Sequence, residues 1–177
     1  MKNAGKVALC GLSAALAAGC MLLSAIPATE YVMPALAGFF LLPVTVELGA
    51  KGGWSAYAAA AVLTLLFAPL PEPKCLFLLF FGCYPVIKCT ADRLRPLLGW
   101  LVKLAVFNTA MLIIYWLLWR VIGLPQDAFE LFGVNLPLIF LLAGNFILPL
   151  YDRAIAVFIR FYCARLQPSL RRVFKQR

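Results

Sequence analysis

Long apolar runs separated by short polar breaks dominate the pattern of this chain. A helix needs about 20 residues to cross the hydrocarbon core of a membrane, with roughly 17–25 as the usual range. Five of the six runs meet this length, and the fourth is shorter and contains Lys88. The pattern therefore predicts an all-α, polytopic integral membrane protein with six transmembrane helices. The runs cover residues 7–26, 31–48, 54–70, 75–90, 97–122 and about 131–150.

The breaks between the runs are rich in proline, glycine and charge: IPATEY, LGAKGG, PLPEPK, CTADRLRP and GLPQDAFE. Short connections of this kind are typical of antiparallel neighbouring helices. They predict a single transmembrane domain over residues 1–150. The first run also has the basic start of a secretory signal peptide, but its apolar length exceeds the usual h-region and its cleavage site is poor. We expect it to be a retained helix.

The last segment, residues 151–177, differs from the runs before it. A helix continuing from Leu131 to Leu166 would measure about 54 Å, too long for one bilayer. Pro149 predicts a kink near the inner boundary, and arginines interrupt the apolar sequence beyond it. We interpret this segment as a basic amphipathic helix, cytoplasmic or interfacial, with a basic tail. A positive-inside anchor without a partner is the equally open alternative.

Composition supports the membrane assignment, since 64% of the residues are hydrophobic and 13% are charged. A soluble domain has about half apolar and about a quarter charged residues. The net charge of +9 comes from basic residues at the ends of the runs, which indicates orientation and anionic headgroups rather than nucleic acid. With six crossings and a cytoplasmic amino terminus, only Lys74 and Arg120 among the basic residues lie outside. The positive-inside rule then predicts that both termini lie in the cytoplasm.

Chemistry-specific motifs are scarce. The chain has six cysteines without a C-x-x-C pair and has no histidine, the commonest metal ligand and general base. It has no nucleophile elbow, zinc-protease motif or P-loop. Tyr84 and Pro85 lie within the fourth run, where a kink is the simpler interpretation. We expect no enzyme activity, no metal and no cofactor.

Two amides lie near the middle of the last two runs. Asn108 shares a helix face with Leu112, Tyr115 and Trp119, and Asn145 lies in the sixth run. This polar stripe predicts an outward-opening pocket for a small amphipathic ligand, lined by Asn108, Tyr115, Trp119 and Asn145. The alternative is an amide bond between helices with interfacial aromatic residues above it.

Charged residues inside the predicted spans form a second candidate set. Such groups are expensive in lipid and mark functional sites by default. Glu47 and Asp152 are both plausible partners for Lys103. The set predicts either a proton or ion relay or a static ion-pair clamp that closes the cytoplasmic end. Its members are Glu47, Lys88, Lys103, Asp152 and Arg153.

Small residues crowd the first run in the stretch GLSAALAAGC. On a helix they form two adjacent rows, Ala14 with Ala18 and Gly11 with Ala15 and Gly19. Small rows let helix backbones approach closely in lipid. Two rows leave room for an external partner beside a neighbour within the bundle.

Six short helices with an alanine-rich first helix resemble the substrate-binding S component of energy-coupling factor transporters. In that family an A-x-x-x-A pattern on the first helix, matched here by Ala14 and Ala18, packs against a transmembrane coupling subunit. The resemblance implies a subunit that binds a vitamin-like small molecule and docks to that subunit and its ATPases. The alternative is a membrane scaffold for envelope assembly without a ligand.

Overall fold

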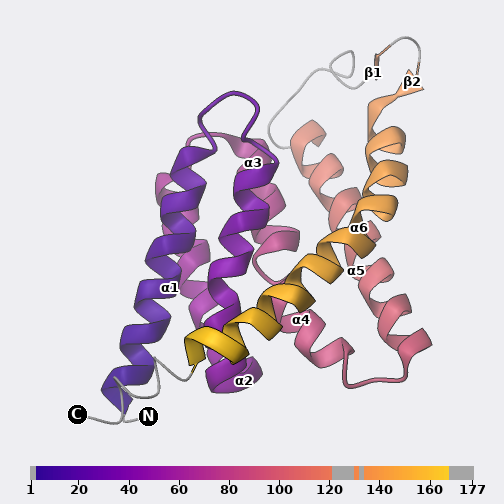
Figure 1. Ribbon diagram of the computed structural model, residues 1–177. Coiled ribbons are helices and arrows are strands. Elements are labelled where there is room, and N and C mark those ends of the chain that lie inside the picture. Colours follow the sequence, from indigo (N-terminus) through magenta and orange to yellow (C-terminus); the bar gives the residue numbers. More distant parts are fainter. Residues whose placement is uncertain (1–2, 121–129, 132–133, 168–177) are drawn as a thin grey trace.

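The computed structural model describes residues 3–120, 130–131 and 134–167, and nearly all of them are helical (Figure 1). A two-residue antiparallel pair joins β1 (Glu130–Leu131) to β2 (Val134–Asn135). The described part of the chain is otherwise built from helices. These are α1 (Asn3–Leu23), α2 (Val32–Phe67), α3 (Pro71–Leu76), the π-helical turn η1 (Phe77–Phe81), α4 (Tyr84–Ala91), α5 (Pro96–Arg120), α6 (Leu136–Phe161) and the π-helical turn η3 (Tyr162–Leu166).

Five segments of the described chain are long and apolar enough to cross a membrane. This agrees with a helical, multi-pass membrane protein. The number is five rather than six because the second and third apolar runs belong to one element, α2. The segments are Asn3–Leu23, Val32–Phe67, Pro71–Ala91, Pro96–Arg120 and Leu141–Leu166.

Gly49 divides α2 into two arms, residues 32–48 and 50–67. It has φ 72° and ψ −170°, the one non-helical conformation inside the element. A β-carbon added to Gly53 would lie 2.6 Å from Oγ1 of Thr45, although eight residues of straight helix would separate the two by about 12 Å. The arms therefore fold back on each other, and Figure 1 shows them side by side against α1. The predicted LGAKGG linker is thus a reversal at one residue.

The segment from α3 to α4 is a broken helix and the most buried of the five. The turn η1 interrupts it, and Pro85 lies in the first turn of α4, where a missing amide hydrogen costs nothing. Tyr57 of α2 donates a hydrogen bond to the carbonyl oxygen of Leu78, at 2.5 Å. Side-chain bonds of this kind satisfy backbone groups that an irregular turn exposes.

Aromatic side chains fill the space between this broken helix and its neighbours. The ring of Phe80 lies 4.9 Å from that of Tyr84 and 5.2 Å from that of Phe107, measured between centroids. Gly38 makes room for the cluster, because a β-carbon there would lie 2.5 Å from the carbonyl oxygen of Phe81. The cluster joins α2, α5 and α6 to the centre of the bundle.

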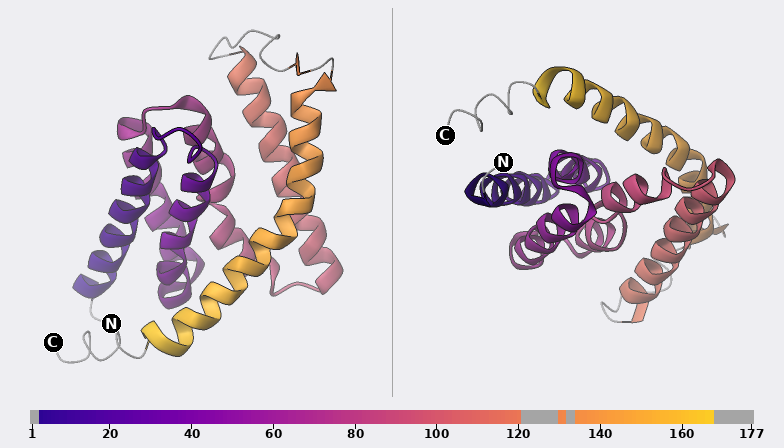
Figure 2. Two further views of the ribbon diagram at one scale, coloured as in Figure 1. Left: turned by 45° about the horizontal axis from the view of Figure 1, so that its top comes forward. Right: turned by 90° about the horizontal axis from the view of Figure 1, so that it is seen from below.

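Helix α6 continues past residue 150, where the sequence predicted a boundary. Pro149 lies inside it, and the helix runs on to Phe161 across the flank of the bundle (Figure 2). Leu148, Asp152 and Ile155 are buried at helical spacing, which keeps this half packed on α2 and α4. Its predicted start also shifts, because Leu131 lies in β1 and the helix begins at Leu136.

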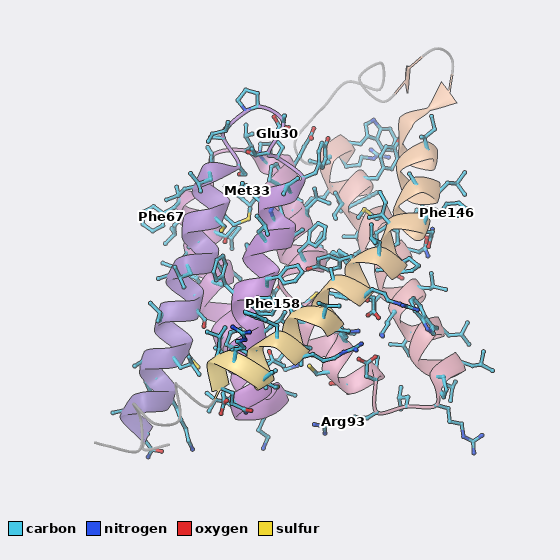
Figure 3. All side chains as sticks on the ribbon, viewed as in Figure 1. Glu30, Met33, Phe67, Arg93, Phe146 and Phe158 are labelled. Carbon is cyan, nitrogen blue, oxygen red and sulfur yellow. The ribbon has the colours of Figure 1, made fainter. Side chains whose placement is uncertain are left out.

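Basic residues gather at one end of the bundle, which we call the basic end. It holds the first turn of α1, the reversal at Gly49 and the connection from α4 to α5. Figure 3 shows Arg93 at this end and Glu30 at the opposite end. The exposed basic residues of these three segments are Lys6, Lys51, Arg93 and Arg95.

Candidate functional site

Asp152 of α6 is the centre of a buried polar cluster. Its Oδ1 accepts hydrogen bonds from the hydroxyl of Tyr84 at 2.8 Å and from Nζ of Lys88 at 2.7 Å. Nζ of Lys103 lies 3.0 Å from the same oxygen. Tyr84, Lys88 and Lys103 are all buried, so three donors from α4 and α5 meet on one carboxylate oxygen of α6.

Asp92 extends the cluster to the surface. Its carboxylate lies 2.6 Å from Nζ of Lys103 and 3.3 Å from Nζ of Lys88. Half of its side chain is exposed, because it follows the last residue of α4 at the basic end. Each lysine therefore has one buried and one accessible carboxylate as partners.

The cluster balances two positive charges with two negative ones, which is what burial requires. An isolated ammonium or carboxylate is costly in an apolar interior, and pairing offsets that cost when the geometry is good. Lys103 also lies 5.2 Å from the centre of the Trp100 ring, a cation–π contact. The arrangement ties three helices together near the basic end.

The sequence set of intramembrane charges is brought together in part. Lys88, Lys103 and Asp152 meet, and of the two predicted partners of Lys103 it is Asp152 that pairs with it. Glu47 is half-buried in α2 and makes none of these four ion pairs, and Arg153 points outward from α6.

Sequence reasoning missed two members of the cluster, Tyr84 and Asp92. Tyr84, Lys88 and Asp92 follow a spacing of four residues, which puts them on one helix face. That spacing was the available signal.

Asn108 and Asn145 form a reciprocal amide pair between α5 and α6. Their side chains exchange two hydrogen bonds, at 3.1 and 3.0 Å, and each also donates to the carbonyl four residues earlier in its own helix. Beside them Gly144 lies directly against the ring of Phe107. At this level the two helices are in close contact, and the amides bond to each other.

The remaining residues of the predicted pocket lie further along α5. Tyr115 and Trp119 are half-buried, whereas Leu112 on the same stripe is exposed. The guanidinium of Arg120 lies 4.9 Å from the centre of the Trp119 ring. The stripe thus borders the packed face of α5 and approaches the end opposite the basic end.

The two small-residue rows of α1 face different surroundings. Ala14 is 2% exposed and packs in the core with α2, and Ala18 is half-buried. Gly11, Ala15 and Gly19 are exposed, and a β-carbon added to either glycine would meet no atom within 4 Å. One row therefore contacts the bundle and the other lies bare on its outer surface.

Within the described residues, no group of three or more His, Cys, Asp or Glu side chains is placed to hold a metal ion. The six cysteines are free thiols. Comparison with protein families, with characterised proteins and with solved structures finds no match to this chain.

Proposed function

We propose that this protein is a membrane-embedded, non-catalytic subunit that binds a small molecule and docks through α1 to a transmembrane coupling partner, as the S component of an energy-coupling factor transporter does. The bare row of Gly11, Ala15 and Gly19 carries the proposal. It offers a second helix a close approach along about two turns, and such contacts drive helix association in lipid. The inward position of Ala14 supports docking through this row, with Ala18 at its edge, rather than through Ala14.

The docking role is tested by replacing two neighbouring alanines of α1 with leucine, one at a time. Ala15→Leu covers the bare row while leaving the core untouched, so co-purification of the partner and its ATPases should be lost at unchanged stability. Ala14→Leu puts the same side chain into the core and should lower stability through overpacking, by about 1–3 kcal/mol. Partner retention in a stable Ala15→Leu protein would overturn the docking role.

The ligand is proposed to bind at the end of the bundle opposite the basic end. Tyr115 and Trp119 would line the site, and the Asn108–Asn145 pair would form its floor. The test is a thermal-stability screen of the purified full chain against vitamins and related cofactors. A stabilising compound should lose its effect in Trp119→Ala and keep it in Trp116→Ala, since Trp116 is exposed outside the stripe. Equal effects in both variants would count against this site.

Six crossings of a bacterial cytoplasmic membrane with both termini in the cytoplasm complete the proposal. The fold-back at Gly49 supports it, since each arm of α2 has about the length of one span. The topology is tested in a variant that lacks the six native cysteines. A single cysteine replaces Lys6, Lys51 or Glu30, and its reaction with a membrane-impermeant thiol reagent is measured. Positions 6 and 51 should react from the cytoplasm and position 30 from outside. Labelling of positions 30 and 51 from the same side would refute the six crossings.

A scaffold without a ligand is the second candidate, and the amide pair favours it. The side chains of Asn108 and Asn145 form hydrogen bonds to each other and to backbone carbonyls of their own helices, which is typical of structural packing. A scaffold should lose its role when the chain is cut after Leu166 and keep it in Asn108→Leu. Loss of ligand binding in Asn108→Leu at unchanged partner assembly would instead favour the binding subunit.

A further inference from the structure

The second half of α6 carries two arginines on its outward face. Arg153 and Arg160 are exposed and seven residues apart, which places them within about 20° of each other around a helix. Within the described residues, neither forms an ion pair with an acidic side chain. Two adjacent positive charges therefore lie on this face without a counter-charge from the bundle.

Apolar side chains surround these arginines on the same face. Leu150 and Val157 are 70% and 61% exposed, one on each side of the turn that carries Arg153. Arginines among exposed aliphatic residues are typical of a helix at the boundary of headgroups and acyl chains, where the guanidinium reaches the headgroups and the stem stays in the apolar layer.

The buried cluster fixes which face of α6 points outward. Asp152 is held inside by Lys88 and Lys103, and Ile155 and Tyr162 are buried on the same side. Phe158 follows them, with its ring edge-on to that of Phe39 at 5.4 Å between centroids (Figure 3). Because the helix is anchored along this face, its arginines cannot turn inward to find a carboxylate.

We infer that this face of α6, defined by Arg153 and Arg160, binds the phosphate groups of anionic phospholipids. The planar guanidinium donates paired hydrogen bonds to phosphate oxygens. The exposed basic residues of the basic end, among them Lys51 and Arg93, add to the same field and favour lipids with net negative charge over zwitterionic lipids. This inference is independent of the proposed function, because it needs neither a ligand nor a coupling subunit.

The test measures which lipids the purified full-length protein retains. The protein is placed in nanodiscs of equal parts phosphatidylglycerol and phosphatidylcholine, released, and its bound lipids are counted by native mass spectrometry. The wild type should retain phosphatidylglycerol in excess. Arg153→Gln with Arg160→Gln should lower that excess by about fivefold for each arginine. The matched control, Lys51→Gln with Arg93→Gln, removes the same charge away from α6 and should lower the excess less, because it weakens the shared field but leaves the paired hydrogen bonds of the two arginines.

A lysine variant and a salt series separate the contribution of charge from that of the planar guanidinium. The double lysine variant, Arg153→Lys with Arg160→Lys, should retain part of the preference, because it keeps the charge and loses the planar donors. The wild-type preference should also fall as salt is raised, since the contact is electrostatic. Equal retention of both lipids by the wild type would overturn the inference and point to an acidic protein on this face. Equal phosphatidylglycerol excess in the wild type and the glutamine variant would overturn it as well.

Discussion

Asp152 and Lys88 are 64 residues apart in the chain and meet at 2.7 Å inside the helix bundle. Lys103 shares the carboxylate of Asp152, so this one acidic residue holds α4 and α5 to α6. In the described structure these ion pairs join three helices, and the static clamp and the relay considered from the sequence both stay predictions.

Removing the charge of Asp152 should destabilise the bundle. In Asp152→Asn, Lys88 and Lys103 keep only Asp92 as an acidic partner, and breaking a buried pair costs about 3–5 kcal/mol. Unfolding midpoints in a denaturing detergent titration measure the loss. Arg153→Gln is the control, because the neighbouring residue is exposed and should leave the midpoint unchanged. Equal midpoints for the two variants would contradict the clamp.

The amide pair should behave as one unit. Asn108→Leu or Asn145→Leu alone should each lower stability by about 0.6–2 kcal/mol, the range for hydrogen bonds between membrane helices. The double variant should cost little more than either single one, because the first substitution already removes the shared bonds. A double-mutant cycle on the unfolding free energies checks this, and full additivity would show that the amides act separately.

Glycine-to-alanine substitutions in two helices should have opposite effects. Gly38→Ala forces a β-carbon to within 2.5 Å of a backbone oxygen in the core and should cost about 1–3 kcal/mol. Gly19→Ala adds the same atom to open space and should gain up to about 1 kcal/mol from helix propensity. The two effects are measured as changes in thermal stability in the same detergent. A loss of stability in Gly19→Ala would mean that the surface of α1 around Gly19 is covered.

The reversal in α2 should depend on glycine at position 49. Its φ of 72° and ψ of −170° lie in a region that is almost exclusive to glycine, so Gly49→Ala should cost about 1–3 kcal/mol. Gly11→Ala, in a regular part of α1, serves as the comparison. Unfolding free energies of both variants give the difference, and an unaffected Gly49→Ala protein would show that the backbone adopts another conformation there.

Periodicity and polarity were sufficient to predict the helical class, the membrane character and most helix positions. They also identified Lys88, Lys103 and Asp152, because charge inside an apolar run is conspicuous, but in one set with Glu47 and Arg153, which make none of the four ion pairs. The pairing itself depends on how α6 crosses α4, which no local pattern encodes. Tyr84 lies four residues before Lys88 on the same helix face, but the acceptor of its hydroxyl, Asp152, lies on another helix.

Two other differences have physical causes. Both rows on α1 consist of small residues, so hydrophobicity does not indicate which row faces the core, and packing with α2 selects Ala14. The arginines beyond Pro149 suggested the end of a span, yet the buried positions Leu148, Asp152 and Ile155 keep their helical spacing through that region. The apolar face of α6 therefore outweighs the charges on its other face.

The reversal at Gly49 has a consequence for biosynthesis. A connection of one residue leaves no slack between the two arms of α2, so neither arm reaches its final position before the other. The first arm should therefore lack its final neighbour in the bilayer until the second arm has been made, and the two should then pair at once. Lys51, beside the turn, stays at the surface where the turn lies, and a tag inserted at this turn would push the paired arms apart rather than simply lengthen a loop.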